Sequence, residues 1–267
     1  MSDLLDFIRQ SKVYDLGQPY FPGMPHYPTH PPFLFGLTKK HGDLVLEGGA
    51  SSAADALALG SHVGTHIDAL CHFSCGGKLH GGVEVKALQS DSGGIAKHSV
   101  DTIAPILRRA VMLDVPALLK MDALPTDFTI TPDHLEAAAK VQGIAVQEGD
   151  VVLLRTGWAR YWNDAARYIT GGQGAHPAGP GPELEGARWL SQRRVFAAGS
   201  DTVAFERVPT PAMPVHVHLL VESGIHIIEA LNLEELSRDR VYEFVFVAAP
   251  LKIRGGTGAP IRPVALV

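Results

Sequence analysis

The chain has 267 residues, of which 46% are hydrophobic and 19% are charged, so it can bury a large core and does not have the composition of a disordered protein. Its 23 Lys and Arg are outnumbered by 28 Asp and Glu, and the formal net charge of −5 excludes the strongly basic surface of a nucleic-acid-binding protein. Two cysteines are too few for a disulfide framework and fit a reducing compartment.

The N-terminal residues have neither the cationic nor the apolar segment of a signal peptide, and no apolar stretch is long enough to cross a bilayer. We therefore expect a cytoplasmic protein that has no membrane segment. No linker divides the chain, so we expect a single domain over residues 1–267.

The predicted elements begin with a short amphipathic segment at residues 4–9, which is followed by a stretch rich in proline and histidine from Gln18 to Phe35. Regular structure cannot persist in this stretch because proline lacks the backbone N–H and fixes φ. We interpret it as an irregular surface loop, or as an arm that covers a site or reaches a neighbouring chain. Beyond it, short valine-rich runs typical of buried strands alternate with helical patterns, which predicts an α/β fold. Strands are expected at 111–115, 151–155, 195–198 and 242–247, and helices at 132–141, 183–193 and 217–223.

Residues 60–72 contain three histidines and one aspartate, a density typical of metal ligands. On a helix His62 and His66 would share a face, but Asp68 would point almost the opposite way. In a straight strand all three would share a face, but His62 and Asp68 would lie about 20 Å apart. The chain must therefore bend here, and the two glycines that allow this are Gly60 and Gly64.

Two imidazoles and one carboxylate form a ligand set for Zn²⁺, Mn²⁺ or Fe²⁺ that leaves coordination positions open, as catalytic sites do. Unrelated polar loop residues are the alternative interpretation. We consider it much weaker, because so dense a cluster seldom serves packing alone.

The segment from His62 to Asp68, followed by His72, resembles the HxGTHxDxxxH signature of the metal-dependent cyclase-family hydrolases, which include bacterial kynurenine formamidases and isatin hydrolases. The resemblance implies a swivelling β/β/α fold, hydrolysis of an amide-type bond by metal-activated water, and a homo-oligomer, either dimer or tetramer. Further matching pieces lie at 14–16, 154–158, 199–201, 229–233, 250–251 and 262–263.

Carried over by position, the resemblance makes His62, His66 and Asp68 metal ligands and His72 the catalytic general base. The neutral-range pKa of an imidazole suits the acceptance and return of a proton. Alternatively, His72 is a fourth ligand or orients one. Cys71 is expected to be a buried apolar residue, and a thiol enzyme built on it lacks a recognisable base.

Two positions depart from the formamidase pattern. Leu70 stands where formamidases carry proline, and Val217 stands where di-zinc formamidases carry the first of two adjacent histidines. We therefore expect one divalent ion, preferably Mn²⁺ with Zn²⁺ as the alternative. His218 keeps its match and is expected to complete the metal site or to support it, and Glu229 is expected to orient a ligand.

The departures favour an isatin hydrolase, which opens the cyclic amide isatin to isatinate, over an arylformamidase acting on N-formylkynurenine. A protein that binds a metal or an aromatic acid without turnover is the alternative from a different class. The expected partner is a small aromatic amide, with no nucleic acid and no membrane. Its pocket is predicted to contain Phe33, Phe35 and Trp158, although core packing explains these aromatics nearly as well, and the remaining histidines, His30 among them, are expected at the surface.

Overall fold

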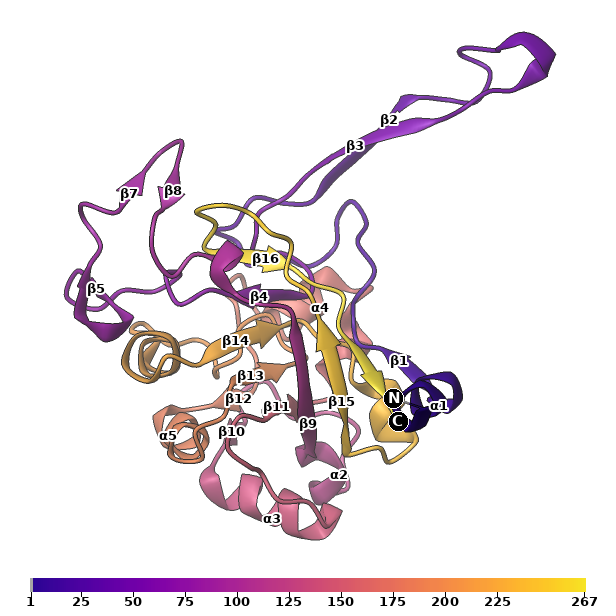
Figure 1. Cartoon of the computed structure of the whole chain (residues 1–267). Coiled ribbons are helices and arrows are strands. Elements are labelled where there is room, and N and C mark those ends of the chain that lie inside the picture. Colours follow the sequence, from indigo (N-terminus) through magenta and orange to yellow (C-terminus); the bar gives the residue numbers. More distant parts are fainter. Residues whose placement is uncertain (1) are drawn as a thin grey trace.

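A mixed sheet of nine strands forms the centre of the computed structural model, which describes residues 2–267, with side chains described from Leu5 onward (Figure 1). From one edge to the other its strands are β1 (Val13–Asp15), β17 (Val264–Leu266), β15 (Glu243–Ala248), β9 (Ile106–Asp114), β11 (Val151–Arg155), β13 (Ala197–Ser200), β14 (His226–Glu229), β4 (His66–Asp68) and β16 (Gly258–Pro260). The four strands from β9 to β14 are parallel, and all other neighbours in the sheet are antiparallel.

Both faces of the central strands are buried, which explains their valine-rich sequences. Along β9 the side chains of Ala110 and Met112 enter one hydrophobic cluster, while those of Val111 and Leu113 enter another on the opposite face. Strand β11 alternates in the same way. The predicted strands at 111–115, 151–155, 195–198 and 242–247 coincide with β9, β11, β13 and β15 to within a few residues, and the α/β prediction is confirmed.

The sheet curls around the first of these two clusters. All nine strands contribute side chains to it, including Tyr14 of edge strand β1 and Ala259 of the opposite edge strand β16. Nine strands spaced about 4.8 Å apart in a flat sheet would keep the two edges far from each other. The shared core therefore requires strong curvature, which brings β4 and β16 over the body of the molecule.

Helices cover the second cluster, to which α3, α5 and the π-helix η5 contribute Leu135, Leu190 and Leu219. The helices predicted at 132–141, 183–193 and 217–223 are confirmed by these three elements. No helix among the described residues combines the length and apolar character that a membrane span requires. The helices are α1 (Ser2–Gln10), α2 (Val115–Leu119), α3 (Pro132–Gln142), α4 (Ala165–Thr170), α5 (Leu184–Gln192), α6 (Pro214–His216), η5 (Val217–Ser223) and α7 (Glu234–Arg238), with 3₁₀ turns at Glu47–Gly49, His80–Gly82, Val100–Thr102 and Trp158–Tyr161.

A long hairpin projects from the body (Figure 1). Its strands are β2 (Leu34–Lys39) and β3 (Ala54–Ala58), and we refer to residues 34–58 as the arm. The proline-rich stretch before it contains no strand up to residue 33 and lies partly against the body, where Met24 and Phe33 are buried. Shorter strand pairs are β5 (Lys78–Leu79) with β6 (Val83–Glu84), β7 (Gln89–Ser90) with β8 (Gly94–Ile95), and β10 (Thr129–Ile130) with β12 (Gly181–Pro182).

Truncation of a β4 side chain that faces the core should destabilise the fold. Ile67 is fully buried in the curled core, so Ile67→Ala should lower the free energy of unfolding by about 2–5 kcal/mol, from lost burial and the cavity that remains. Urea unfolding followed by circular dichroism measures this change. Val141→Ala, at a position that is 72% exposed, is the control and should change stability by less than about 0.5 kcal/mol. Equal stability of the two variants would contradict the assignment of Ile67 to the core.

Candidate metal centre

Strand β4 presents two of the predicted ligands on one face. His66 and Asp68 are two residues apart in the strand, so both side chains lie on the side opposite to Ile67, which enters the core. The antiparallel register with β14 places Glu229 directly opposite His66. An imidazole and two carboxylates are thereby gathered on one buried surface of the sheet.

The turn before β4 supplies the bend that the spacing of the ligands requires. Gly64 has φ +71°, and a Cβ there would lie 2.4 Å from the ring of Tyr20, so only glycine fits. The turn folds His62 back, so that its Nδ1 lies 2.7 Å from Asp68 Oδ1. On the other side of the ring, Nε2 lies 2.8 Å from Thr257 Oγ1. An ion held by both His62 and Asp68 would replace the hydrogen bond between them.

His72 lies in the turn after β4, and its ring stacks on that of His62 with 3.8 Å between the centroids. Neither ring nitrogen is hydrogen-bonded to any described residue. Burial lowers the pKa of His72 to about 3, although the charge of Asp68 opposes the shift. The ring is therefore neutral at neutral pH.

His216, at the end of α6, is a fourth histidine of the site that we did not predict. Its Nδ1 lies 2.6 Å from a carboxylate oxygen of Glu206, while its Nε2 faces Glu229 at 3.3 Å and Asp68 at 3.8 Å. Burial alone would lower the pKa of His216, but the hydrogen bonds to Glu206 and Glu229 and the charge of Asp68 raise it to about 10. A carboxylate that holds one imidazole nitrogen while the other faces a ligand cluster is a common arrangement around protein-bound metals.

The structure does not bring His218 to this site, so the expectation that it completes the ligand set is corrected. Its Nδ1 lies 2.7 Å from Glu222 and its Nε2 lies 2.8 Å from Ser191 Oγ. Two residues apart on a helix, His216 and His218 point to nearly opposite sides. The sequence indicated which of the two histidines faces inward, because residues four apart share a helix face. His216 shares its face with the apolar Leu220, whereas His218 shares its face with the charged Glu222.

Glu229, which was expected to orient a ligand, is the last residue of β14. Its Oε1 accepts a hydrogen bond from the backbone N–H of Phe205 at 2.9 Å, and its Oε2 lies 3.5 Å from His66 Nε2. The carboxylate is therefore close enough to the cluster to bind an ion directly as well as to orient a ligand.

The donor chemistry of these residues fits a divalent cation. Burial opposes ionisation of Asp68, yet His72 and His62 hold the pKa of this carboxyl well below its usual range. Its Oδ2 is buried and accepts no hydrogen bond from the described part of the chain. His66 donates from Nδ1 to the carbonyl of Gly64 at 2.8 Å, which leaves its Nε2 free to bind a metal. A buried carboxylate among imidazoles, with one oxygen that accepts no hydrogen bond, suits a bound divalent cation.

Two groups of ligand atoms share Asp68. His62, Asp68 and His72 form one group, and Asp68, His216 and Glu229 form the other, with the ligand atoms of each group lying within 4.8 Å of one another. The expectation of a single ion depended on Val217. Because His216 supplies a donor in the second group, Val217 does not by itself remove a second position.

A cavity of about 240 Å³ opens onto both groups. The proline-rich stretch supplies part of its wall, including His30, whose Nδ1 donates to the backbone carbonyl of His62 at 3.2 Å. His30 is half-buried and lines the cavity, so the expectation of a surface residue is corrected for it. The other wall residues outside the ligand groups are Tyr27, Thr29, Phe73, Val203, Ala204 and Met213.

The aromatic residues predicted for the pocket lie elsewhere. Phe33 is buried in a separate hydrophobic cluster together with Trp158, whose indole N–H donates to the carbonyl of Leu124 at 3.0 Å. Phe35 is 47% exposed at the base of the arm. The spacing of aromatic residues in a proline-rich stretch did not indicate which rings point towards the cavity. Tyr27 and Phe73 line the cavity instead of the three predicted residues.

The curled α/β sheet places histidines and carboxylates together beside a small cavity, which indicates a protein that binds a metal ion. The family model Cyclase, described as "Putative cyclase", matches residues 14–207, and the chain belongs to this family. The chain is 27% identical to the isatin hydrolase of Roseibium aggregatum over 215 residues, which are 79% of this chain and 73% of that protein.

Two solved structures extend this similarity to the whole fold. The structure of a novel cyclase has a TM-score of 0.86 and 29% identity, covering 99% of this chain and 90% of the other. Isatin hydrolase A from Ralstonia solanacearum has a TM-score of 0.78 and 28% identity, covering 100% of this chain and 96% of the other. The swivelling β/β/α class implied by the signature is confirmed, and these relatives together with the donor groups support a hydrolase of the cyclase family.

Separate substitution of His216 in α6 and His218 in η5 should distinguish their roles. His216→Ala should weaken binding of Mn²⁺ or Zn²⁺ by tenfold or more, on the order of the effect of losing a metal-site residue, because it removes a donor of the second group. His218→Ala should leave binding unchanged, because its ring bonds to Ser191 and Glu222 instead. Isothermal titration calorimetry of the two metal-stripped variants measures this. An equal loss in both would contradict the assignment.

Metal uptake at the second group should also release a proton. With a pKa of about 10, His216 is protonated near neutral pH, and coordination requires a bare nitrogen. Affinity should therefore rise as the pH increases towards 10. Calorimetry in buffers of different ionisation enthalpy should detect a larger proton release for the wild type than for His216→Ala. Equal release would place the ion outside this group.

Proposed function

We propose that this chain is a metal-dependent hydrolase that opens a cyclic amide, with isatin as the substrate and isatinate as the product. The observation that carries the proposal is the buried, ionised Asp68, which shares two groups of candidate ligand atoms with residues that line a small cavity. The similarity to isatin hydrolases over most of the chain supports the choice of substrate.

Mn²⁺ is the proposed ion and Zn²⁺ the alternative, since both accept imidazole and carboxylate ligands. His62 and His66 would hold it together with Asp68, because His62 Nδ1 lies 2.7 Å and His66 Nε2 3.5 Å from Asp68 Oδ1. His72 stacks on His62, and Glu229 and His216 form the second group around the same carboxylate. A divalent ion in such a site lowers the pKa of bound water to about 7 and polarises a carbonyl group.

His72 is proposed to move the proton. When water adds to the amide carbon, a C–O bond forms and the C–N bond breaks, so one proton must leave the water and one must reach the nitrogen. His72 lines the cavity and has no hydrogen-bond partner among the described residues, so it is placed to accept the first proton and to return it to the leaving nitrogen. When a cyclic amide is hydrolysed, the amine and the new carboxylate remain in one molecule, so the product is a single ring-opened acid.

The cavity limits the size of the substrate. At about 240 Å³ it lies below the range of about 300–1,000 Å³ that is typical for drug-sized ligands, which favours a compact molecule. Phe73 supplies an aromatic wall next to the reactive groups, with its ring centroid 4.9 Å from that of His72 and 4.8 Å from that of His216. A flat benzo-fused ring would match such a wall.

Arylformamidase activity on N-formylkynurenine is the second candidate, and it is supported by His216, which adds a donor to a second group of metal ligands. We expected a single ion because Val217 replaces a histidine that di-zinc formamidases carry. The second donor group, which contains His216, could nevertheless bind a second ion. Metal analysis of the refilled protein distinguishes the possibilities, because one ion per chain fits the first candidate and two ions fit the second.

Side-by-side hydrolysis tests the proposal. Chelator-stripped protein refilled with Mn²⁺ or Zn²⁺ should open isatin, followed by ultraviolet absorbance, and should lose this activity again when the chelator returns. Turnover of N-formylkynurenine alone would move the chain to the formamidases. Silence on both substrates with metal bound would contradict hydrolysis of either amide and favour a binding role.

Replacement of the proposed proton carrier should separate chemistry from metal binding. His72→Ala should reduce kcat by about 10²–10⁴-fold, the usual contribution of a general base, and still retain metal through the remaining donors. His176→Ala, at an exposed position in a loop far from the cluster in sequence, is the control and should behave as the wild type. Full activity of His72→Ala would remove His72 from the mechanism.

A further inference from the structure

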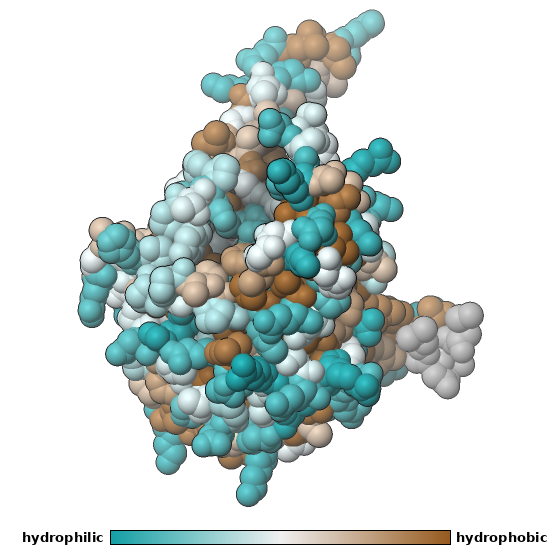
Figure 2. All heavy atoms as spheres, turned by 90° about the vertical axis from the view of Figure 1, so that its left-hand side faces the viewer, coloured by the Kyte–Doolittle hydropathy of each residue, from teal (hydrophilic) through white to brown (hydrophobic). Residues whose placement is uncertain are grey.

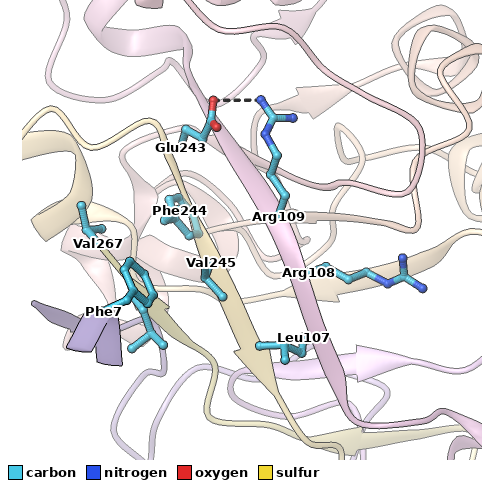
Figure 3. Close-up of a pocket in the computed structure, with 9 residues that line it drawn as sticks. Phe7, Leu107, Arg108, Arg109, Glu243, Phe244, Val245 and Val267 are labelled. Atoms are coloured by element: carbon cyan, nitrogen blue, oxygen red, sulfur yellow. Dashed lines mark hydrogen bonds and ion pairs between the residues drawn. The ribbon is translucent and has the colours of Figure 1, made fainter. Parts of the chain in front are cut away.

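Two open surfaces of the molecule away from the metal centre are mainly apolar. Hydrophobic residues gather at the far end of the arm, as Figure 2 shows. A groove between α1 and strands β9 and β15 is lined by Phe7, Leu107 and Val267, and an ion pair joins Arg109 and Glu243 at 2.8 Å beside it (Figure 3). Selection among small polar molecules needs a polar group that is free to pair inside a confined space. The cavity at the metal centre has such a group in His30.

A turn of the proline-rich stretch holds His30 in place. The backbone N–H of His30 donates to the carbonyl of Tyr27 at 2.9 Å, which closes a four-residue turn with Pro28 at its second position, where the fixed φ of proline suits a β-turn. Pro31 follows and disfavours helical backbone at His30. Its carbonyl accepts a hydrogen bond from Gly60 at 3.4 Å, which ties the turn to the segment before the ligands. The ring is therefore placed by a stiff backbone, and little ordering is needed when a ligand binds.

The hydrogen bond from the His30 ring to the backbone fixes which ring nitrogen carries the hydrogen. A carbonyl oxygen can only accept, so Nδ1, which lies 3.2 Å from the carbonyl of His62, must be the donor. In the neutral ring Nε2 then has no hydrogen and can only accept a hydrogen bond. No residue in the described part of the chain donates to this nitrogen. Because His30 lines the cavity, its Nε2 is an acceptor that a ligand can use.

The other polar groups of the cavity wall are less selective or have another use. The donor atoms of the two ligand groups surround Asp68. The hydroxyl groups of Tyr27 and Thr29 can donate as well as accept, so they suit a carbonyl, an N–H or a water molecule alike. A nitrogen that accepts but cannot donate requires an N–H or O–H from the ligand. His30 is therefore the wall residue that can distinguish a ligand with a hydrogen on its nitrogen from one without it.

His30 also lies next to the groups to which the reaction is assigned. Its ring centroid is 5.3 Å from that of His62 and 6.4 Å from that of His72. Hydrogen bonds of about 3 Å from two rings can span such a separation, so one substrate nitrogen can lie between His30 and His72. In a small cyclic amide the N–H and the C=O point to the same edge of the ring. A carbonyl directed at the ion therefore brings the neighbouring N–H to the same side of the cavity.

We propose that His30 selects substrates whose amide nitrogen carries a hydrogen, by accepting that N–H at Nε2 while the adjacent carbonyl faces the ion. This role rests on the proposed hydrolysis of a cyclic amide and identifies the part of the substrate that the cavity distinguishes. A carbon substituent on the nitrogen would leave Nε2 without a partner in a cavity of about 240 Å³, and an unmade hydrogen bond in a confined site costs more than a made one contributes. Ring amides with a free N–H, isatin among them, are therefore favoured over N-alkylated ones.

Binding of two inert ring amides tests this role without turnover. Oxindole has the cyclic amide of isatin but not its ketone, and N-methyloxindole lacks the N–H. Calorimetry on the Mn²⁺-loaded protein at about pH 8, where imidazole is neutral, should show about tenfold tighter binding of oxindole by the wild type. His30→Phe keeps a ring of similar size without the acceptor, so it should bind oxindole about tenfold more weakly and N-methyloxindole as the wild type does. Thr29→Val, which removes a hydroxyl from the same wall, should keep the wild-type preference.

The ratio of the two affinities separates ligand recognition from support of the His62 carbonyl. An equal loss of both ligands in His30→Phe, or loss of the preference in Thr29→Val, would overturn the role of His30. So would a wild type without any preference, whether or not the variant folds, which circular dichroism and Mn²⁺ content establish. Isatin turnover is measured on the same protein. A preference for oxindole without turnover of isatin would contradict the proposed function and still support recognition of the N–H by His30.

Discussion

The functional end of this molecule depends on one buried carboxylate. Asp68 is only 1% exposed, yet nearby imidazoles keep it ionised, and one of its oxygens has no partner in the described part of the chain. Such a charge is tolerated only where cationic or metal partners converge on it. Histidines from the segment 62–72 and from α6 therefore meet at β4. The curvature of the sheet, which seats β4 between β14 and β16, makes this convergence possible.

The central strands could be predicted from the sequence, whereas the strands that carry the site could not. Strands β9 and β11 are runs of valine and leucine buried on both faces, and their composition alone indicates a strand. Strands β4 and β14 have three and four residues and contain histidine and a carboxylate, so no local pattern identifies them. Their conformation is imposed by pairing with residues distant in sequence. The curl of the sheet has the same origin.

The same division applies to the site. The clustering of the candidate ligands in the segment 62–72 could be predicted because their spacing and their resemblance to a family signature are local properties. His216 and His30 come from other segments, and only the tertiary fold shows that they face Asp68 and the cavity. For His216 a local indication existed in the apolar residue four positions later. For His30 we find none, because a proline-rich stretch has no periodicity from which a facing direction could be inferred.

A line of aromatic rings connects the ligand-bearing turn to the arm. Tyr20 fills the space beside Gly64, Phe33 packs edge-on against Tyr20 with 5.7 Å between the centroids, and Phe35 stacks on Phe33 at 6.4 Å. At the base of the arm the N–H of Gly60 donates to the carbonyl of Pro31 at 3.4 Å, two residues before the first ligand. The arm and the metal centre are therefore held by continuous packing. Because such packing transmits a change only if it has two arrangements, a displacement of the arm would affect the ligand turn only by shifting these rings.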